Sequence, residues 1–536
     1  MKQRWLGCWL GWLCLLAPVA EAASWHLCDC APGADADCVA GNDADAGSAQ
    51  APWRTLQAGR SRFRTMAAGD EILLCRGGQL QESSGGGWFN SACQPAQRCR
   101  IGAYTPPWAS GDEGPPVIEA LGDVSALEFV DGGNANRDGG YRVEDLRLLG
   151  HGGNGFGLFF YNDVDDVEAA RLEISGFNVG VHLAGSNPCD PNDSDCDGRN
   201  ERIVVRDSLI RDNHGQGVLG GGNDFHLLRN QVLRNGTRNN LDHNVYLSGT
   251  TRGVRAIGNT LIGAARDGSG LCQAVSLVVH GVFDDLRIEN NHISEGPGLA
   301  GPGCWGIAVA PGHNTAERFD DVVIAGNQIE YVGNVAIGVG ACRRCTIENN
   351  TIVGGQDYAV SAIEAPVCCG GPEDPAIDQL LIRNNSIWLG RRNGVGVALG
   401  DAGGEHRISH NAIELADPIG SACFAITAPA RLLQMDRQRC AATQGSVPWV
   451  AGQGDLLAWQ GATGFDSAST EQLPGFSAAA AGDFHALDAS AAMVDGGDPA
   501  SASPIDRLGQ DRPVPPDIGA EEWRGEALLA DGFEGS

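Results

Sequence analysis

The stretches VVIAGNQIE, residues 322–330, and CTIENNTIV, residues 345–353, share one design. Each is a short apolar strand, then an asparagine, then a second short strand. Across the chain the repeated asparagines are Asn230, Asn259, Asn291, Asn327, Asn350, Asn385 and Asn411. Their spacings run from 23 to 36 residues, as if a coil of about 23 residues carried optional loops. A repeat of this length indicates a solenoid of stacked units.

A third strand type lies between these units, as in VGVHLAG at residues 179–185 and NVYLSG at residues 244–249. Alternation points Val181 and Leu183 to one face of the first strand, and Val245 and Leu247 to one face of the second. Three short strands per coil predict an all-β protein: a single-stranded, right-handed parallel β-helix of about ten coils.

The repeated asparagine has a structural explanation. A sharp bend between two strands requires a left-handed backbone conformation, which Asn tolerates better than most residues. Stacking also lets each amide side chain bond the turn of the neighbouring coil. We therefore predict a structural ladder of asparagines and not a functional site.

The ends of a solenoid need covers, because an open end exposes the hydrophobic core and unpaired strand edges. Residues 51–78 predict a short amphipathic helix that leads into a first strand, and residues 483–497 and 512–523 are interpreted as a closing segment. The predicted division is a signal peptide at 1–22, a disulfide-containing N-terminal cap with the first coils at 23–115, the β-helix at 116–420, the C-terminal coils and cap at 421–522, and an acidic tail at 523–536.

The first residues are typical of a secretory signal. Lys2 and Arg4 precede an apolar stretch from Trp5 to Ala17, and Ala20-Glu21-Ala22 offers small residues for cleavage. No later stretch reaches the roughly 20 apolar residues of a membrane span. The sequence predicts an exported protein, extracellular or periplasmic.

Export makes the cysteines informative. Of 18 cysteines, Cys8 and Cys14 leave with the signal, and 18 − 2 leaves an even 16. An oxidising compartment favours disulfides over metal ligation. Spacing suggests the local pairs Cys93 with Cys99, Cys189 with Cys196 and Cys423 with Cys440, and Cys272 with Cys304 as a link between adjacent coils, but it leaves the connectivity open.

The charge pattern narrows the choice of partners. Lys2 is the only lysine, so the mature chain has 37 − 2 = 35 basic residues, all arginine, against 67 − 1 = 66 acidic residues. A net charge near −31 argues against nucleic acid or an anionic membrane as partner. The same charge weighs against long-range attraction of a polyanionic glycan, although a local arginine groove can still bind one. The expected partner is a polysaccharide, and we expect a monomer.

The Asn-x-Ile ladder, the opening PWRTLQAG…AGDEILLCRGG at residues 52–78 and the ending DIGAEEW at residues 517–523 resemble the pectate-lyase-like superfamily of secreted right-handed β-helix proteins. The resemblance covers roughly residues 52–522. It implies the fold more specifically than the activity, because that superfamily includes lyases, hydrolases, epimerases and proteins of unknown role.

The resemblance also implies a substrate groove along the outer face of one sheet. If the apolar residues of the third strand type point inward, His182, Asn244 and Tyr246 point outward, and Ser276 continues this row. Histidine and tyrosine can act as acid or base, so His182 and Tyr246 are candidate catalytic residues. Asn244 and Ser276 are candidate substrate-binding residues.

The stretch RNNLDHNVYLSG, residues 238–249, concentrates further polar groups. Asp242 and His243 stand just before the strand and are candidate catalytic residues. His214, from the preceding coil, and Arg238 are candidate substrate-binding residues. The alternative is structural: Asp242 caps a turn and His243 packs in it.

Family motifs limit the chemistry. Hydrolases that resemble polygalacturonase carry Asn-Thr-Asp, Asp-Asp, Gly-His-Gly and Arg-Ile-Lys in that order, and this chain lacks the first and the last. The pairs Asp165-Asp166, Asp284-Asp285 and Asp320-Asp321 recur just before a ladder strand, so we interpret them as turn devices and not as a catalytic dyad. The absence of lysine from the mature chain excludes a lysine-based lyase, and an arginine base stays open.

An acidic segment is a candidate calcium site. In NPCDPNDSDCDGRNE, residues 187–201, Asp193, Asp195 and Asp197 alternate as in the first half of a calcium loop, with Asp190 nearby. The full EF-hand pattern fails, because its twelfth position is Val204. Calcium is therefore a candidate cofactor, structural or catalytic, and the alternative is a solvated acidic loop.

Two functions follow from these observations. The first is a secreted carbohydrate-active protein that binds and cleaves an extracellular polysaccharide, by lyase or glycoside hydrolase chemistry, in a groove near residues 180–280. The second is a non-catalytic surface or adhesion protein that binds glycans. A groove shared by His182, His243, Tyr246 and an arginine would favour the enzyme.

Overall fold

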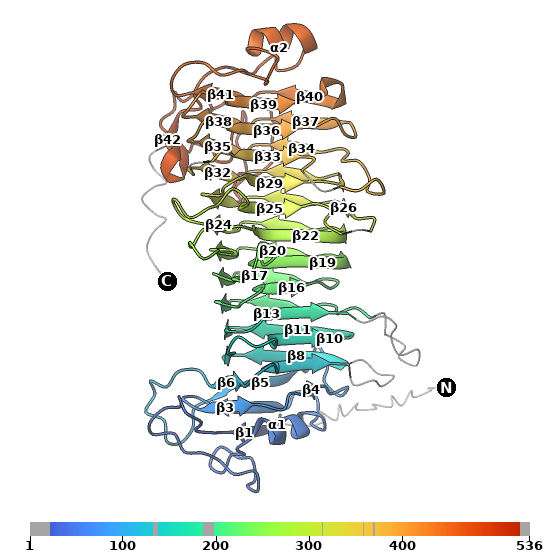
Figure 1. Ribbon diagram of the computed structural model, residues 1–536, viewed down its shortest axis with the longest axis vertical. Coiled ribbons are helices and arrows are strands. Elements are labelled where there is room, and N and C mark those ends of the chain that lie inside the picture. The colour runs from blue at the N-terminus through green and yellow to red at the C-terminus, as the bar shows by residue number, and fades with distance from the viewer. Residues whose placement is uncertain are drawn as a thin grey trace, which may run out of the picture.

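The computed structural model describes residues 22–131, 138–185, 198–313, 315–356, 358–367 and 370–525. Three long parallel sheets wind around one axis (Figure 1), which confirms the predicted right-handed parallel β-helix. The three stacks hold 12 to 14 strands each in the described residues, somewhat more than the predicted ten or so coils.

Sheet I has 14 strands. They are β1 (Ser24–Leu27), β2 (Glu71–Cys75), β5 (Cys99–Tyr104), β8 (Asp138–Glu144), β11 (Val164–Ala170), β14 (Val204–Arg206), β17 (His226–Leu228), β20 (Arg255–Ile257), β23 (Arg287–Glu289), β27 (Val323–Ala325), β31 (Thr346–Glu348), β34 (Leu381–Arg383), β37 (His406–Ser409) and β40 (Leu432–Asp436).

Sheet II has 13 strands. They are β3 (Gln79–Glu82), β6 (Val117–Ala120), β9 (Arg147–Leu149), β12 (Glu173–Ser175), β15 (Leu209–Arg211), β18 (Gln231–Leu233), β21 (Thr260–Ile262), β24 (His292–Ser294), β28 (Gln328–Glu330), β32 (Thr351–Gly354), β35 (Ser386–Leu389), β38 (Ala412–Leu415) and β41 (Arg439–Ala442).

Sheet III carries the candidate site. Its strands are β4 (Gly87–Trp88), β7 (Leu127–Val130), β10 (Phe156–Tyr161), β13 (Val179–Ala184), β16 (Val218–Gly220), β19 (Val245–Arg252), β22 (Val275–Asp284), β25 (Trp305–Val309), β29 (Val335–Val339), β33 (Ser361–Ala365), β36 (Val395–Leu399) and β39 (Ala422–Ile426), with β26 (Arg318–Asp320) and β30 (Cys342–Arg343) continuing from β22.

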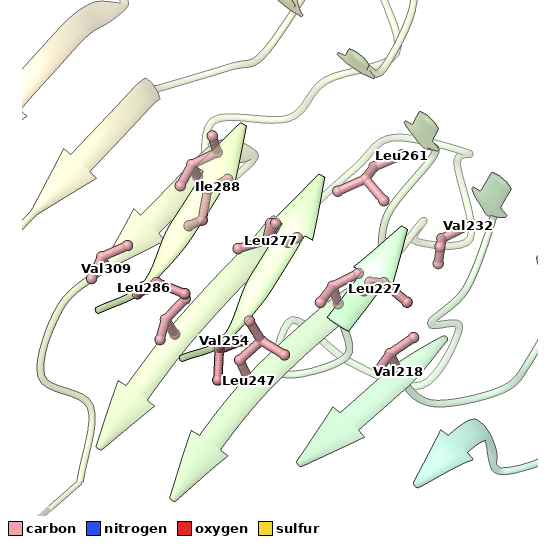
Figure 2. Close-up of a cluster of buried hydrophobic side chains, with 14 of the residues drawn as sticks. Val218, Leu227, Val232, Leu247, Val254, Leu261, Leu277, Leu286, Ile288 and Val309 are labelled. Atoms are coloured by element: carbon pink, nitrogen blue, oxygen red, sulfur yellow. The ribbon is translucent and has the colours of Figure 1, made fainter. Parts of the chain in front are cut away.

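One continuous core fills the cylinder. Figure 2 shows side chains from all three sheets converging inside it, such as Leu227 of sheet I, Val232 of sheet II and Leu247 of sheet III. Each of these three side chains is at most 1% exposed. Burial of such rows, at about 25 cal/mol per Å² of apolar surface, is the main source of stability for the stacked coils.

The asparagine ladder is confirmed, with one correction. In Asn259 and Asn291, as in their neighbours, each Oδ1 accepts from the backbone N–H and the Nδ2 of the preceding ladder residue, at 2.9 and 3.0 Å for this pair. The left-handed residue is not the ladder asparagine but the one before it, such as Arg229 or Asn349, with φ of 52° and 56°. The ladder residue therefore supplies hydrogen bonds and its predecessor makes the bend.

The Asp pairs are turn devices, as predicted. The second residue of each pair, Asp166, Asp285 or Asp321, has a left-handed φ between 53° and 55°. Each carboxylate binds an arginine of the same or the next coil, as Asp321 binds Arg344 at 2.7 Å. Asp165 and Asp166 belong to β11 of sheet I, whereas Asp284 and Asp320 end β22 and β26 just before the chain enters the next strand of sheet I.

The N-terminal cap follows the prediction. Helix α1 (Leu56–Phe63) begins at Thr55, whose side chain accepts from the Ala58 N–H, and it buries Leu56 and Phe63 against the first coils. The opposite end is covered by helix α2 (Leu456–Thr463), with Trp459 fully buried (Figure 1). This cover lies in the predicted C-terminal region but precedes the segment that we expected to close the end.

The predicted closing segment runs back along the side of the solenoid instead. It begins with β43 (Asp483–Ala486), which follows β42 (Phe476–Ala478) and η2 (Ala479–Ala481) in the chain, and η1 (Pro429–Arg431) lies earlier in the last coils. Its later part bonds the bends before the ladder: Asn384 Nδ2 donates to the Gly519 carbonyl at 3.2 Å. The segment can attach there because Asn349 and Asn384, the left-handed residues of their bends, point away from the core. Their side-chain amides donate to backbone carbonyls of the segment.

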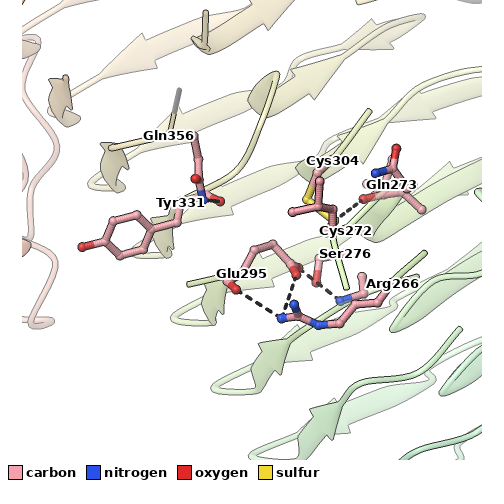
Figure 3. Close-up of a disulfide and its surroundings, with 12 residues drawn as sticks. Arg266, Cys272, Gln273, Ser276, Glu295, Cys304, Tyr331 and Gln356 are labelled. Carbon is pink, nitrogen blue, oxygen red and sulfur yellow. Dashed lines mark hydrogen bonds and ion pairs between the residues drawn. A yellow bond between two sulfur atoms is a disulfide. The ribbon is translucent and has the colours of Figure 1, made fainter. Parts of the chain in front are cut away.

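Six disulfides are present in the described residues. Three were predicted, Cys93–Cys99, Cys272–Cys304 and Cys423–Cys440, and three were not, Cys28–Cys75, Cys30–Cys38 and Cys342–Cys345. Figure 3 shows Cys272–Cys304 joining two coils beside Glu295 and Arg266. The predicted pair Cys189–Cys196 and almost all of the predicted signal peptide lie outside the described residues. In the part of the chain that the structure describes, no helix is long and apolar enough to cross a membrane.

Candidate functional site

The outer face of sheet III differs from the prediction at two positions. Asn244 and Ser276 are fully buried, and the Asn244 Nδ2 lies 3.3 Å from the Ser276 Oγ, so neither faces a groove. The reason is the corner between sheets II and III, where the residue that starts the strand also points inward. Other coils place Gly217 or Gly306 at this position, in register with Asn244 and Ser276.

Asp242 is a turn residue, as the structural alternative had it. It is 1% exposed, and its carboxylate accepts from the Arg238 guanidinium at 2.7 Å and from the Arg238 backbone N–H at 3.0 Å. Arg238 also donates to the Asn178 side chain at 2.6 Å. His214 is exposed at the same corner, where the Thr237 N–H donates to its carbonyl. The structure therefore does not bring Asp242, Arg238 or His214 to the outer face of sheet III.

Tyr246 and His182 do face outward, but they lie two coils apart. In register, His182 pairs with Leu219, and Leu219 pairs with Tyr246. At about 4.8 Å per coil the two side chains are about 10 Å apart along the axis. His182 stacks on Phe159 with ring centroids 5.1 Å apart, and burial lowers its pKa to about 4.

A second group of polar side chains surrounds Tyr246, and most of it was missed. The His243 and Tyr246 rings stack with centroids 5.5 Å apart, and His280 meets Tyr246 edge to face at 5.5 Å. His313 meets His280 at 5.5 Å, and its Nε2 lies 3.4 Å from the Tyr246 Oη. We call His243, Tyr246, His280, His313 and Glu317 the Tyr246 cluster.

Hydrogen bonds fix how two of these histidines carry their protons. The Nδ1 of His243 lies 2.8 Å from the Val275 carbonyl, and the Nδ1 of His280 lies 2.6 Å from the Ala310 carbonyl. Because a carbonyl only accepts, each Nδ1 bears the hydrogen, and each neutral ring keeps its lone pair on Nε2.

Burial sets the protonation states of the Tyr246 cluster. Desolvation lowers the pKa of His243 to about 4 and also lowers the pKa of His280. Desolvation, and then the charge of Glu317, raise the pKa of Tyr246. At neutral pH the cluster therefore combines a neutral imidazole, which can accept a proton, with a phenol that retains one.

Glu317 holds the loop that covers the cluster. It is 1% exposed, and its carboxylate accepts from the backbone N–H groups of Gly312 at 2.6 Å and His313 at 3.2 Å. The backbone of Gly312 lies directly against His280, since an added Cβ would stand 2.4 Å from the imidazole. Glu317 therefore acts as a positioning residue, because it holds the Gly312 backbone that packs against His280.

An open depression of about 640 Å³ adjoins the cluster on sheet III. Ser248 lines it and is in register with His280, and His182 lines its other side. Its floor is bare backbone, Gly220 to Gly222 and Gly249. Among the described residues that line it, Arg199 is the one permanently charged side chain and no carboxylate is present. On a chain with 67 acidic and 37 basic residues this composition suits an anionic ligand.

The metal prediction is not tested by this geometry. Asp190, Asp193, Asp195 and Asp197 all lie outside the described residues. Within the described residues, the possible ligands that come within 4.8 Å of one another are Cys272, Cys304 and Glu295, and the two cysteines form a disulfide.

The sequence did contain a signal for the missed residues. His280 occupies an alternating strand, SLVVHGVF, two positions after Val278, which is the true register partner of Tyr246. The prediction took Ser276 instead of His280 as the outward residue of this coil, because the inward-pointing corner residue breaks the alternation. His313 and Glu317 come from a loop, where alternation gives no guidance.

Comparison with known proteins supports the fold. No family model and no curated protein matches the chain. A solved complex of XylC with xylose has a TM-score of 0.50 and 10% identity, over 93% of this chain and 98% of that one. The Dettilon tailspike protein has a TM-score of 0.43 and 13% identity, over 65% of this chain and 63% of that one. The chain therefore spans less than two thirds of that protein's length. An alginate lyase from Paenibacillus sp. str. FPU-7 has a TM-score of 0.33 and 13% identity, over 70% of this chain and 97% of that one. The match to XylC, at a TM-score of 0.50, agrees with the β-helix fold.

Proposed function

We propose that this protein is an exported enzyme that cleaves a uronate-containing polysaccharide on the outer face of sheet III, by β-elimination. The observation that carries the proposal is the Tyr246 cluster beside the depression lined by Arg199. A proton acceptor and a proton donor beside a lining with no carboxylate among its described residues support elimination next to a uronate. The six disulfides support export, because disulfides persist in oxidising compartments.

Substrate binding uses the bare floor of the depression. Gly221 and Gly249 leave backbone exposed in the depression, and Arg199, which already has an interaction partner within the protein, adds positive charge to its lining. A chain that follows the solenoid axis passes from His182 over Leu219 to Tyr246, because these residues form one outward row.

The chemical step uses two side chains. The Nε2 lone pair of His280 removes the C5 proton of the uronate, and its electrons form the C4=C5 double bond as the C4–O glycosidic bond breaks. The Tyr246 O–H gives its proton to the departing oxygen. His280 then releases its proton to water, and Tyr246 regains one through the 3.4 Å contact with His313.

Hydrolysis is less well supported. Glycoside hydrolases use two carboxyl groups about 5–9.5 Å apart, one of which is an acid. In the described residues the Tyr246 cluster has one carboxylate, Glu317, whose oxygens already accept from two backbone N–H groups. This arrangement suits positioning and not proton donation to a glycosidic oxygen.

Calcium remains part of the proposal. Gly185 and Gly198 both line the depression, and they flank the acidic segment for which calcium binding was predicted. Carboxylate oxygens are the ligands that calcium prefers. A cation held by that segment would add positive charge beside the uronate site.

The test is an activity assay on purified mature protein. Alginate, polygalacturonate and other uronate polymers, with neutral glycans as controls, are incubated with and without a calcium chelator. We expect unsaturated uronate, seen by its ultraviolet absorbance, from at least one acidic polymer. New reducing ends without that absorbance would indicate hydrolysis, and no product from any polymer would leave the alternative of glycan binding without cleavage.

A further inference from the structure

We infer that Phe156, Phe159 and Tyr161 form a platform that binds the uncharged face of a neutral sugar residue, about three coils from Tyr246. This inference rests on the proposed function, because it extends the same polysaccharide path along sheet III. We call these three residues the aromatic platform.

The platform is a connected set of rings on the outer face. Centroids lie 4.7 Å apart for Phe156 and Phe159, and 5.5 Å apart for Phe159 and Tyr161. Leu158 and Phe160, which alternate with Phe159 and Tyr161, are fully buried in the core, whereas Tyr161 is 41% exposed. Phe156 and Phe159 are half-buried and Tyr161 is exposed, and a contiguous apolar surface of this kind is typical of ligand-binding grooves.

The platform is continuous with the depression. The His182 ring stacks on Phe159 at 5.1 Å and meets Phe156 edge to face at 4.6 Å, and the same His182 lines the depression. The outward row runs in register from Phe159 to His182 to Leu219 to Tyr246. Three coils at about 4.8 Å put Phe159 about 14 Å from Tyr246, a distance that an oligosaccharide spans and a single sugar does not.

The surroundings favour a neutral residue over a uronate. Glu128 is the register partner of Phe159 on the neighbouring strand, and burial raises its pKa. The nearby cation Arg60 is 3% exposed and forms an ion pair with Glu82 at 3.1 Å, so it does not reach the surface. An aromatic face gains from contact with the C–H face of a pyranose, and beside Glu128 a second negative charge is disfavoured.

The substrate class that follows is a mixed polysaccharide. A uronate lies at the Tyr246 cluster, and a neutral sugar lies on the aromatic platform a few residues along the same chain. The two surfaces differ in charge, so each contributes its own selectivity.

The test measures binding with the Tyr246→Phe protein, so that cleavage does not interfere. Cellotetraose, xylotetraose and mannotetraose are the neutral probes, and tetragalacturonate is the acidic one, all titrated by calorimetry and saturation-transfer NMR. We expect at least one neutral tetrasaccharide to bind, and Phe159→Ala and Tyr161→Ala each to weaken it at least fivefold. Trp523→Ala removes an equally exposed aromatic at the other end of the chain and is expected to change nothing.

The outcomes separate this inference from the proposed function. Failure of every neutral tetrasaccharide to bind at millimolar concentration would overturn the inference, and so would binding that both platform variants leave unchanged. If no polymer is cleaved but neutral binding depends on the platform, the elimination mechanism fails and the platform stands.

Discussion

The two halves of sheet III share one scaffold but present different surfaces. From β10 to β25 the outer row carries Phe159, His182 and Tyr246, and the polar cluster and depression lie beside it. From β29 to β39 the same row holds Gly338, Glu364, then alanines. Gly338 lies under Val367, whose atoms an added Cβ would approach to 3.1 Å. We call these the active half and the plain half of sheet III.

The core does not explain this difference. Ile307 of the active half and Ile337 of the plain half are equally buried and are register partners. The asparagine ladder also runs through both halves with the same bond lengths. Because each coil is held by its inward residues, its outward residues are free to vary, and function can be confined to a few coils.

The largest expected effect comes from breaking the active half at its chemical centre. Tyr246→Phe removes the proposed proton donor, and His280→Ala removes the proposed base. Each is expected to lower kcat by about 10²–10⁴-fold, the usual contribution of a positioned acid or base. Steady-state assays on the polymer that gives product measure this effect.

The matched control for that pair is Glu364→Gln in the plain half. Glu364 is an outward carboxylate in the same row of the same sheet. Its substitution is expected to leave kcat unchanged. Equal losses in all three variants would remove the distinction between the two halves.

The pH dependence of activity is expected to be a broad plateau. His280 acts as a base only when neutral, and burial lowers its pKa below the ordinary 6.5, so the acidic limb lies below pH 6.5. Tyr246 donates only when protonated, and burial raises its pKa above the ordinary 10, so the alkaline limb lies above pH 10. A kcat/KM profile checks both limbs, and an activity optimum confined below pH 6 would contradict these assignments.

A smaller effect is expected from a single methyl group over the cluster. In Gly312→Ala the new Cβ would stand 2.4 Å from the His280 ring, so the ring or the loop must move. We expect about a tenfold loss of kcat from this misplacement, with the fold intact. Gly340→Ala in the plain half, whose nearest atom would be 3.4 Å away, is expected to keep full activity.

Substitutions in the asparagine ladder are expected to affect the stability of the active half and of the plain half about equally. Asn291→Ala and Asn385→Ala each leave a buried backbone N–H and a buried side-chain amide of the preceding ladder residue without their acceptor. Each is expected to lower the free energy of unfolding by about 1–3 kcal/mol. Denaturant unfolding measures the effect, and a loss in one half alone would show that the scaffold is not shared.

How far the sequence could predict this molecule follows from the physics of each part. The ladder asparagines and alternating valines gave the fold, because inward residues obey a fixed period. Asn244 and Ser276 were misplaced because the corner residue breaks that period. His313 and Glu317 were missed because a loop brings them to Tyr246. The strap over Asn384 was also missed, since its partner Gly519 lies 135 residues further along the chain.

Hydrogen exchange of Tyr246→Phe, with and without the polysaccharide that the wild-type protein cleaves, tests the central claim most directly. The claim is that the polymer lies on the active half. We predict protection of backbone amides in β16 and β19 and in the Gly220 to Gly222 run, and none in β33 and β36. Protection confined to the plain half, or to the turns of the asparagine ladder, would contradict it.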